Sequence, residues 1–278
     1  MNVIKWIVRW ILRMFANAFA VVGTLVALSL LMVVFLGVYG AVSVKTLPPN
    51  MVLTLDMRGD AMLDQPSQAG FGIGREPISF IELVQALARA EDDERVKGIF
   101  LRVGGGMAPA HLQEMRRAID SFRAKGKFVI AHAQEFFSTG LSEYYVATIA
   151  DDIWLQPMSN LNTSGIQTTT VFLRGLFDKI EATPHFSQRY EFKNAANVYT
   201  ETDYTPPHRA ATEGLIRSLY DTLVGDMAAA RQKDRVAFTG ILDAGPYFTE
   251  TAVSNGLVDR AGYDDDAEKA ALDRAGDG

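Results

Sequence analysis

The sequence contains no cysteine and only four histidines, and both shortages exclude kinds of chemistry. Without cysteine there is no disulfide framework, no thiolate metal site, no iron–sulfur cluster and no cysteine nucleophile. The histidines lack the spacing of metal ligands. They are His111, His132, His185 and His208. We therefore predict no metal site. The compartment stays open, because exported proteins do not need disulfides.

Acidic residues are missing from the first 44 positions, which contain three basic residues. The whole chain has 27 basic and 33 acidic residues, so the remainder has 24 against 33 and a charge of −9. Nucleic-acid binding requires a concentrated positive face, and we therefore exclude nucleic acid as a partner. With 278 residues, 48% of them hydrophobic, the chain can form one large or two small domains.

Residues 14–44 contain no charged side chain. About 20 helical residues, rising about 1.5 Å each, cross a hydrocarbon core of about 30 Å. The stretch is also about twice as long as the apolar region of a cleaved signal peptide, which has about 7–15 residues. We interpret residues 14–44 as a retained transmembrane signal anchor that contacts the lipid bilayer. A buried core helix is the alternative.

Basic residues flank this anchor unequally. Those before it recur every four positions and are Lys5, Arg9 and Arg13. After it, only Lys45 is basic before Arg58. The positive-inside rule therefore places residues 1–13 in the cytoplasm and the rest of the chain across the membrane. A short stalk, residues 45–50, leads to the main domain, residues 51–278.

Beyond the stalk, short apolar runs alternate with amphipathic stretches, a pattern typical of an α/β domain with a largely parallel sheet. The predicted strands are 52–57, 97–103, 127–132, 152–156 and 185–192. The predicted helices are 79–92, 109–124, 138–150, 206–233 and 267–274. Thr205 and two prolines give the helix at 206–233 its start signal. Its apolar stripe, which includes Ile216 and Tyr220, is expected to lean on a neighbouring element or on another subunit. The chain stops at Gly278 without a closing strand or cap, as in a chain cut short.

Three consecutive glycines, Gly104, Gly105 and Gly106, follow an apolar strand and precede a helix. Such a loop can turn its backbone N–H groups toward a phosphate or toward an oxyanion. No Walker loop and no Gly-x-Gly-x-x-Gly pattern is present, which disfavours phosphate binding. A tight turn without any ligand is the alternative.

Lys193 follows the aromatic-rich run 185–192. Burial lowers the pKa of a lysine, and this can make the amine a general base. If the run is a strand that continues to Lys193, however, Glu191 lies on the same face and holds the ammonium charged. A solvated lysine at the end of a strand is therefore the alternative.

The order of these features resembles the amino-terminal half of the signal peptide peptidase A family, in its long, two-repeat, membrane-anchored form. The matching segments are 52–56 after the anchor, 98–106 with the glycine loop, 144–157 with its paired tyrosines, 190–195 around Lys193, and 255–259 at the end of the repeat. The resemblance implies the Clp protease/crotonase fold, a spiral of ββα repeats with a largely parallel sheet.

The resemblance also implies a serine–lysine peptidase, in which a lysine takes the proton of a nucleophilic serine. Lys193 occupies the place of that lysine, and Gly104 to Gly106 correspond to a loop that donates an oxyanion-hole amide. The family implies no cofactor, peptide substrates such as cleaved signal peptides, and a homo-oligomer. It also implies a single-pass protein of the bacterial inner membrane with a periplasmic main domain.

The position of the nucleophile departs from the family pattern. Where the single-repeat form has Ser-Gly-Gly-Tyr-Tyr, residues 141–145 read Leu-Ser-Glu-Tyr-Tyr. A leucine thus replaces the serine, and long-type members carry their serine in the second repeat. Ser142 is an alternative nucleophile that would need a turn shifted by one residue, and Ser138 is a further hydroxyl nearby. Asn194, Asn197 and Val198 also differ from the family pattern after the lysine.

We therefore predict the membrane-anchored, lysine-bearing half of a serine–lysine endopeptidase. Two rival interpretations stay open. The first is a non-catalytic membrane-tethered scaffold or peptide-binding repeat. The second is crotonase-type acyl-CoA chemistry on the same fold, which is disfavoured because the sequence offers no basic patch for the phosphates of coenzyme A.

Overall fold

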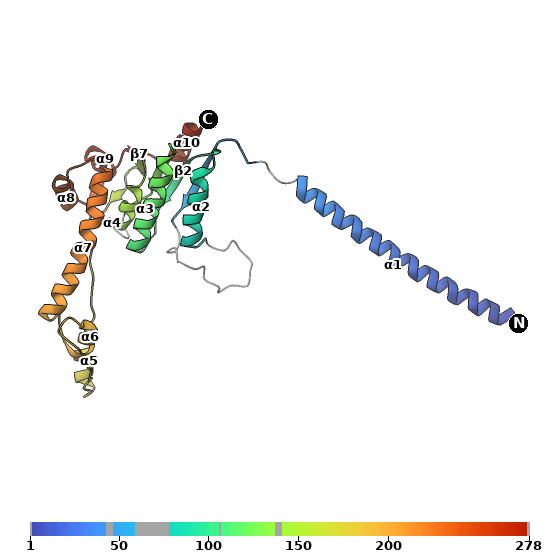
Figure 1. Ribbon diagram of the computed structural model, residues 1–278, viewed down its shortest axis with the longest axis horizontal. Helices are drawn as coiled ribbons and strands as arrows, with labels where there is room; N and C mark the ends of the chain where they lie inside the picture. Colours follow the sequence, from blue (N-terminus) through green and yellow to red (C-terminus); the bar gives the residue numbers. More distant parts are fainter. Residues whose placement is uncertain (1, 43–46, 59–77, 106, 137–140, 277–278) are drawn as a thin grey trace. The chain divides into compact units, whose positions relative to one another are not determined.

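The computed structural model describes residues 2–42, 47–58, 78–105, 107–136 and 141–276. The chain divides into two compact units, residues 1–48 and 49–278, and each is described by itself. The first unit consists of one helix, α1 (Asn2–Val42) (Figure 1). Its window Phe19–Leu36 has a mean hydropathy of 2.7, and none of it is buried. By length and composition, this helix can cross a membrane.

The second unit is built on a parallel five-stranded sheet in the order β1-β2-β3-β4-β7. The strands are β1 (Met51–Asp56), β2 (Val96–Val103), β3 (Phe128–Ala133), β4 (Asp152–Leu155) and β7 (Arg260–Ala261). The central strands are almost continuously apolar, because helices cover both of their faces. A short antiparallel pair, β5 (Asn160–Leu161) and β6 (Tyr247–Phe248), lies apart from this sheet. The α/β class with a largely parallel sheet is thus confirmed.

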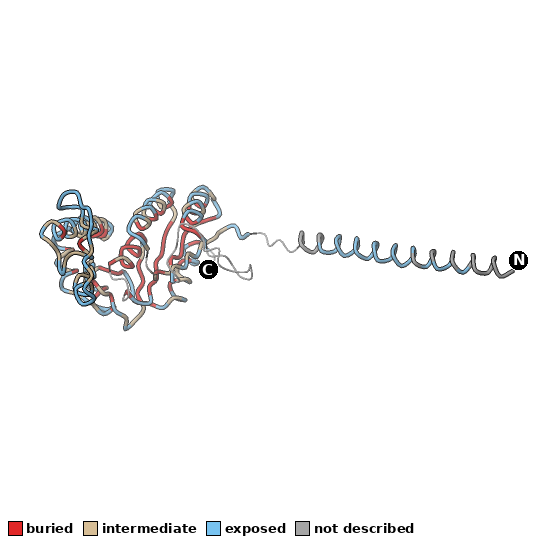
Figure 2. Tube along the Cα trace, turned by 90° about the horizontal axis from the view of Figure 1, so that it is seen from below, coloured by how far each residue is buried: buried red, intermediate tan, exposed pale blue. Residues whose placement is uncertain are grey.

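Helices of different composition cover the two faces of the sheet. On one face lie α2 (Phe80–Asp92), α3 (Pro109–Ala124) and α4 (Leu141–Ala147), whose apolar sides join the main core. The other face packs against α10 (Asp264–Ala275) through Ala267, Ala271 and Ala275. Three alanines at a spacing of four residues let the helix approach the aromatic side chains Phe100, Phe128 and Trp154. In Figure 2 the buried residues concentrate on the strands and on the helix sides turned toward them.

A projecting part of the second unit lies between β5 and the middle of α7 (Pro206–Ala230), and we call residues 162–218 the arm. The arm contains α5 (Arg174–Lys179), the 3₁₀ turn η1 (Asn194–Ala196) and α6 (Asn197–Thr200), which lie far from the sheet in Figure 1. The carboxyl half of α7 packs into the core through Leu223, Val224 and Met227. It lies beside α8 (Arg235–Asp243), and α9 (Thr249–Ser254) follows near the edge of the sheet.

The predicted strands at 52–57, 97–103, 127–132 and 152–156 are confirmed within two residues. The predicted strand at 185–192 is wrong, because these residues form an irregular, exposed segment that pairs with no strand in the described chain. Its aromatic residues gave the segment the composition of a strand, yet Phe186, Tyr190 and Phe192 all point into solvent. Tyr190 even has a φ of +65°, which a regular strand does not allow.

The predicted helices are confirmed among the described residues, with α7 ending at Ala230. Of the helix predicted at 138–150, residues 138–140 lie outside the described residues and α4 covers Leu141–Ala147. The hydroxyl of Thr205 accepts a hydrogen bond from the N–H of His208, as a helix cap does. The prediction that the last helix lacks a cap is wrong, because Gly276 ends α10 in the left-handed conformation with a φ of 89°. The short strand β7 pairs with β4 and precedes this helix.

Candidate functional site

The paired tyrosines of α4 fix this helix in the core, since both are completely buried. The hydroxyl of Tyr144 donates to the carbonyl oxygen of Leu257 at 2.6 Å, and that of Tyr145 donates to Asp226 at 2.7 Å. Arg116 donates to the carbonyl oxygen of Tyr145, and its guanidinium lies 4.4 Å from the ring centroid. Burial, with the hydrogen bond to Asp226, raises the pKa of Tyr145 to about 12, so this phenol stays protonated near neutral pH.

At position 141 the resemblance to the single-repeat form implies the nucleophilic serine. In this chain a side chain of the core occupies that position. Leu141 is only 2% exposed and belongs to the main apolar cluster. Ser142 follows in the first turn of α4 and is partly exposed, and Glu143 is again buried. Ser142 as a nucleophile stays a prediction, and Ser138 lies outside the described residues. The structure thus places a buried apolar side chain where the resemblance to the single-repeat form implies a serine.

The glycine loop follows the carboxyl end of β2, and α4 packs against the same strand. A Cβ at Gly104 would lie 3.0 Å from the Cα of Arg58, so the loop has no room for a side chain there. Gly105 has a φ of 70°, in the left-handed region that favours glycine. Gly106 lies outside the described residues. Backbone packing therefore accounts for two of the glycines, and their role in an oxyanion hole stays a prediction.

Lys193 lies on the arm and is exposed. It precedes η1, and its N–H donates to the carbonyl oxygen of Tyr190 at 3.4 Å. Its ammonium pairs with no side chain in the described part of the chain, and Glu191 is also exposed. The strand that would have placed Glu191 and Lys193 on one face does not form. In the single chain α4 packs against β2, which the glycine loop follows, whereas α5 and α6 of the arm that contains Lys193 lie away from both (Figure 1).

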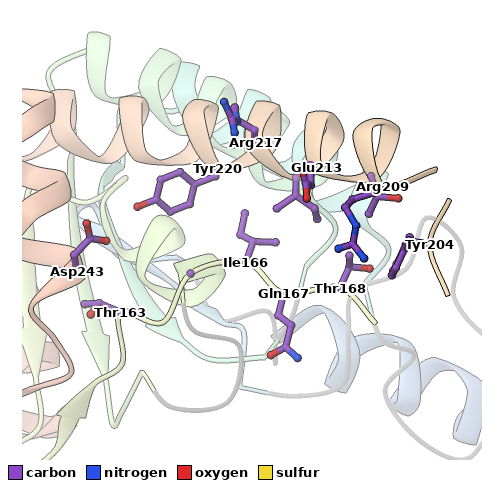
Figure 3. Close-up of a pocket in the computed structure, with 13 residues that line it drawn as sticks. Thr163, Ile166, Gln167, Thr168, Tyr204, Arg209, Glu213, Arg217, Tyr220 and Asp243 are labelled. Carbon is purple, nitrogen blue, oxygen red and sulfur yellow. The ribbon is translucent and has the colours of Figure 1, made fainter. Parts of the chain in front are cut away.

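A groove that the sequence did not locate runs along the arm, between the extended segment 163–168 and α7 (Figure 3). It encloses about 680 Å³. Its apolar lining comes mainly from Ile166, Ile216 and Tyr220. The only sequence signal was the apolar stripe on the helix at 206–233, whose partner in the chain could not be named from the sequence.

A second feature that the sequence did not indicate is a charged network at the carboxyl ends of the strands. The buried His132 lies with Nε2 3.2 Å from the carbonyl oxygen of Gly262 and with Nδ1 3.4 Å from Asp264. Asp264 also pairs with Arg102 at 2.8 Å. Burial lowers the pKa of His132, although Asp264 opposes this shift. The network joins the first residue of α10 to β2 and β3. In the described residues no group of three metal-ligating side chains forms.

The carboxyl-terminal half of the main domain matches a known protein family. A family model described as "Peptidase family S49" matches residues 121–276, which is more than half of the chain. The chain therefore belongs to peptidase family S49. The matched region contains α4 with its paired tyrosines, the groove, the arm with Lys193, and α10.

Several curated proteins are similar to most of this chain. Protease 4 of Salmonella typhi is 26% identical over 246 residues, which are 81% of this chain and 39% of that protein. Protease 4 of Haemophilus influenzae is 29% identical over 164 residues, 57% of this chain and 26% of that protein. The chloroplastic serine protease SPPA of Arabidopsis thaliana is 23% identical over 81% of this chain and 32% of its own length. The chain thus spans between about a quarter and two fifths of these relatives.

Solved structures resemble the chain more distantly. The ClpP protease catalytic domain of Plasmodium falciparum has 10% sequence identity and a TM-score of 0.42, over 76% of this chain and 85% of that one. A membrane-bound stomatin-specific protease, solved with a substrate peptide, has 12% identity and a TM-score of 0.41, over 81% of both chains.

Proposed function

We propose that this chain is the membrane-anchored, lysine-bearing half of a serine endopeptidase that hydrolyses cleaved signal peptides or other short apolar peptides. The observation that carries this proposal is the family match over residues 121–276, because it includes α4 and the arm with Lys193. The curated relatives named as proteases support the same reaction class.

In the proposed mechanism, a serine hydroxyl attacks the peptide carbonyl while the amine of Lys193 takes its proton and later returns it to the leaving amine. The oxyanion that forms would accept a hydrogen bond from a backbone N–H of the loop at Gly104 and Gly105. The buried Leu141 supplies no hydroxyl. We therefore place the nucleophile in a second repeat outside these 278 residues.

The exposure of Lys193 sets a condition on this mechanism. A lysine amine becomes an effective base near neutral pH only when burial or a neighbouring cation lowers its pKa. In this chain the side chain is exposed on the arm. The second half, or another copy of the chain, must therefore cover the arm in the active enzyme. Exposed apolar side chains support such a cover, and they include Leu176, Ile180, Phe186 and Phe192, each at least 51% exposed. This also supports the proposed homo-oligomer.

We further propose that α1 is a single-pass anchor in a bacterial inner membrane, with residues 1–13 in the cytoplasm and the main domain in the periplasm. The apolar window Phe19–Leu36 supports the anchor. The basic residues on one side of this window support the orientation. A periplasmic domain next to the bilayer would meet signal peptides soon after they are released.

A second candidate function is a non-catalytic, membrane-tethered scaffold or peptide-binding repeat. The specific observation that favours it is Leu141, which is buried at the position of the serine. This candidate keeps the groove and the anchor but requires no chemistry at Lys193.

The proposal is tested by co-expressing the full chain with the second half and by measuring the cleavage of a fluorogenic apolar peptide. The variant Lys193→Ala is expected to lower the cleavage rate at least 100-fold, the scale of a lost general base. Lys179→Ala is the matched control, because Lys179 is another exposed lysine on the arm. Cleavage that survives Lys193→Ala removes Lys193 from the mechanism. If the chain and the second half together cleave no peptide, the result favours the non-catalytic scaffold.

A further inference from the structure

Two contacts hold the walls of the groove in fixed register. At one end Gly165 faces Tyr220, because a Cβ on this glycine would lie 3.9 Å from the tyrosine ring. At the other end the hydroxyl of Tyr204 donates to Thr170 at 2.6 Å. The extended segment and α7 therefore run in opposite directions, and the groove between them is open at the surface. Twelve helical residues, from Arg209 to Tyr220, span about 16 Å, which matches about five residues of an extended peptide.

The extended wall offers unused backbone groups. Residues 165–170 make no backbone hydrogen bond to any described residue, so their N–H and C=O groups form an open edge. An extended peptide can add to such an edge as a further strand, and its side chains then alternate between the groove and solvent. The middle of the groove is lined by Ile166 and Ile216, which suit apolar side chains.

The two ends of the groove carry opposite charges. Asp243 lies at the end near Thr163, whose hydroxyl donates to the carbonyl oxygen of Leu242 at 2.6 Å. Asp243 itself is exposed and forms no ion pair with a described side chain. Arg209 lies at the other end, where its guanidinium is 5.2 Å from the ring centroid of Tyr204. Its one ionic partner among the described side chains, Asp203, is 3.7 Å away, which leaves most of its donors available.

The lining also contains a pair of charges along the rim. Glu213 and Arg217 are four residues apart on the exposed side of α7, and together they add no net charge. Glu213 lies one helical turn from both Arg209 and Arg217, so Arg209 and Asp243 are the outermost charges of the lining at the two ends of the groove. Figure 3 shows this arrangement, with Asp243 and Thr163 at one end, Arg209 and Tyr204 at the other, and Ile166 between them.

We propose that this groove binds an extended peptide in one direction, with a cationic side chain at Asp243, apolar residues at Ile166 and Ile216, and a free carboxylate at Arg209. This assignment rests on the proposed function, since it names the substrate class of the same arm, but it concerns binding and not cleavage. A peptide of about five residues with a basic beginning, an apolar middle and a newly formed carboxyl end fits all three parts.

The experiment measures binding by fluorescence anisotropy with the full chain in neutral detergent micelles. The probe is a five-residue peptide with an acylated, fluorescent amino end, a first-position lysine, three apolar residues and a final alanine with a free carboxylate. Two companion peptides change one group each, a carboxamide for the carboxylate and a norleucine for the lysine. Arg209→Gln and Asp243→Asn are compared with Arg117→Gln and Glu135→Gln, which alter exposed charges outside the groove.

Arg209→Gln is expected to weaken binding of the free acid about five- to tenfold, and to leave the carboxamide unchanged. Asp243→Asn is expected to weaken binding of the lysine peptide to the same degree, and to leave binding of the norleucine peptide unchanged. This coupling between one protein charge and one peptide charge is the double-mutant signature of direct contact. The two control variants are expected to bind all three peptides like the unchanged chain.

The inference is overturned if the three peptides bind equally, or if each variant weakens them all alike. It is also overturned if no peptide binds and the groove variants instead change the mass of the particle in light scattering, because a second copy then fills the groove. The result is separable from the proposed function. Suppose that binding depends on the paired charges as expected, but that Lys193→Ala cleaves peptides at the full rate. The groove assignment would then hold, and the mechanism with Lys193 as general base would be wrong.

Discussion

His132 and Asp264 lie far apart in the sequence, and Nδ1 of the imidazole lies 3.4 Å from the carboxylate. The histidine sits on the central strand β3 and the aspartate begins α10, so the pair joins the last helix to the middle of the sheet. Arg102 on β2 completes the contact through its ion pair with the same carboxylate. The docking of α10 therefore depends on charged groups as well as on its three alanines.

This pair predicts a pH dependence of stability. Burial lowers the pKa of His132 in the folded chain, whereas an unfolded histidine has a pKa of about 6.5. As the pH falls below about 6.5, the unfolded chain takes up a proton that the folded chain resists, so the free energy of unfolding decreases. His132→Gln is expected to make this decrease shallower in urea titrations between pH 5 and 7.5. The exposed His185→Gln should keep the original slope, and an unchanged slope in His132→Gln would contradict the assignment.

The contact between Tyr145 and Asp226 predicts a cost for removing one hydroxyl. Tyr145→Phe removes a buried hydrogen bond of 2.7 Å and is expected to destabilise the main domain by about 0.5–1.5 kcal/mol. Tyr190→Phe is the control, because Tyr190 is 72% exposed. The measurement is the midpoint of urea unfolding followed by the fluorescence of Trp154. Equal midpoints for both variants would show that the hydroxyl contributes nothing.

Gly98 and Gly225 predict opposite effects of the same substitution. A Cβ at Gly98, on β2, would overlap the ring of Phe128 on β3, so Gly98→Ala is expected to cost about 1–3 kcal/mol. Gly225 lies inside α7 with no atom within 4 Å of an added Cβ. Gly225→Ala is therefore expected to stabilise by up to about 1 kcal/mol through the higher helix propensity of alanine. Thermal unfolding of both variants tests the pair, and the idea fails if both shift the midpoint in the same direction.

The apolar window of α1 predicts how the chain is retained in membranes. Val26 and Leu30 lie near the middle of this window. The substitutions Val26→Arg and Leu30→Arg are each expected to make membrane insertion less favourable by about 2.5–3.5 kcal/mol. The double variant should appear in the soluble fraction after carbonate extraction. Asn17→Arg lies before the window and should leave the chain in the membrane fraction. A double variant that stays in the membrane would contradict the anchor.

The local pattern of apolar and polar residues was sufficient to predict most strands and helices of the main domain. Strands such as β2 and helices such as α3 were predictable, because each buries one continuous apolar run or one apolar face against the sheet. The run at 185–192 failed for the opposite reason. Its aromatic side chains are exposed on the arm, where Phe186 stacks on Tyr199 instead of entering the core, so a pattern that normally reports burial was misleading.

The candidate site was predictable only where its parts are close in sequence. The register around residues 141–145 placed a leucine at the expected position of the serine; Leu141 is buried, and the register itself stays a prediction. The groove joins residues near 165 with residues near 215, and His132 meets Asp264 across more than 130 positions. No local spacing encodes such pairs. The role of Lys193 stays a prediction, since its burial depends on groups that the single chain does not supply.

The exposure of Lys193 has a consequence for unwanted proteolysis by chains that have not yet assembled. If Lys193 is the base, as proposed, a lone copy of the chain is inert, because a general-base lysine must be covered by another surface and Lys193 is exposed in the single chain. Assembly itself would then act as the on-switch, and lone chains could diffuse among membrane proteins without digesting them.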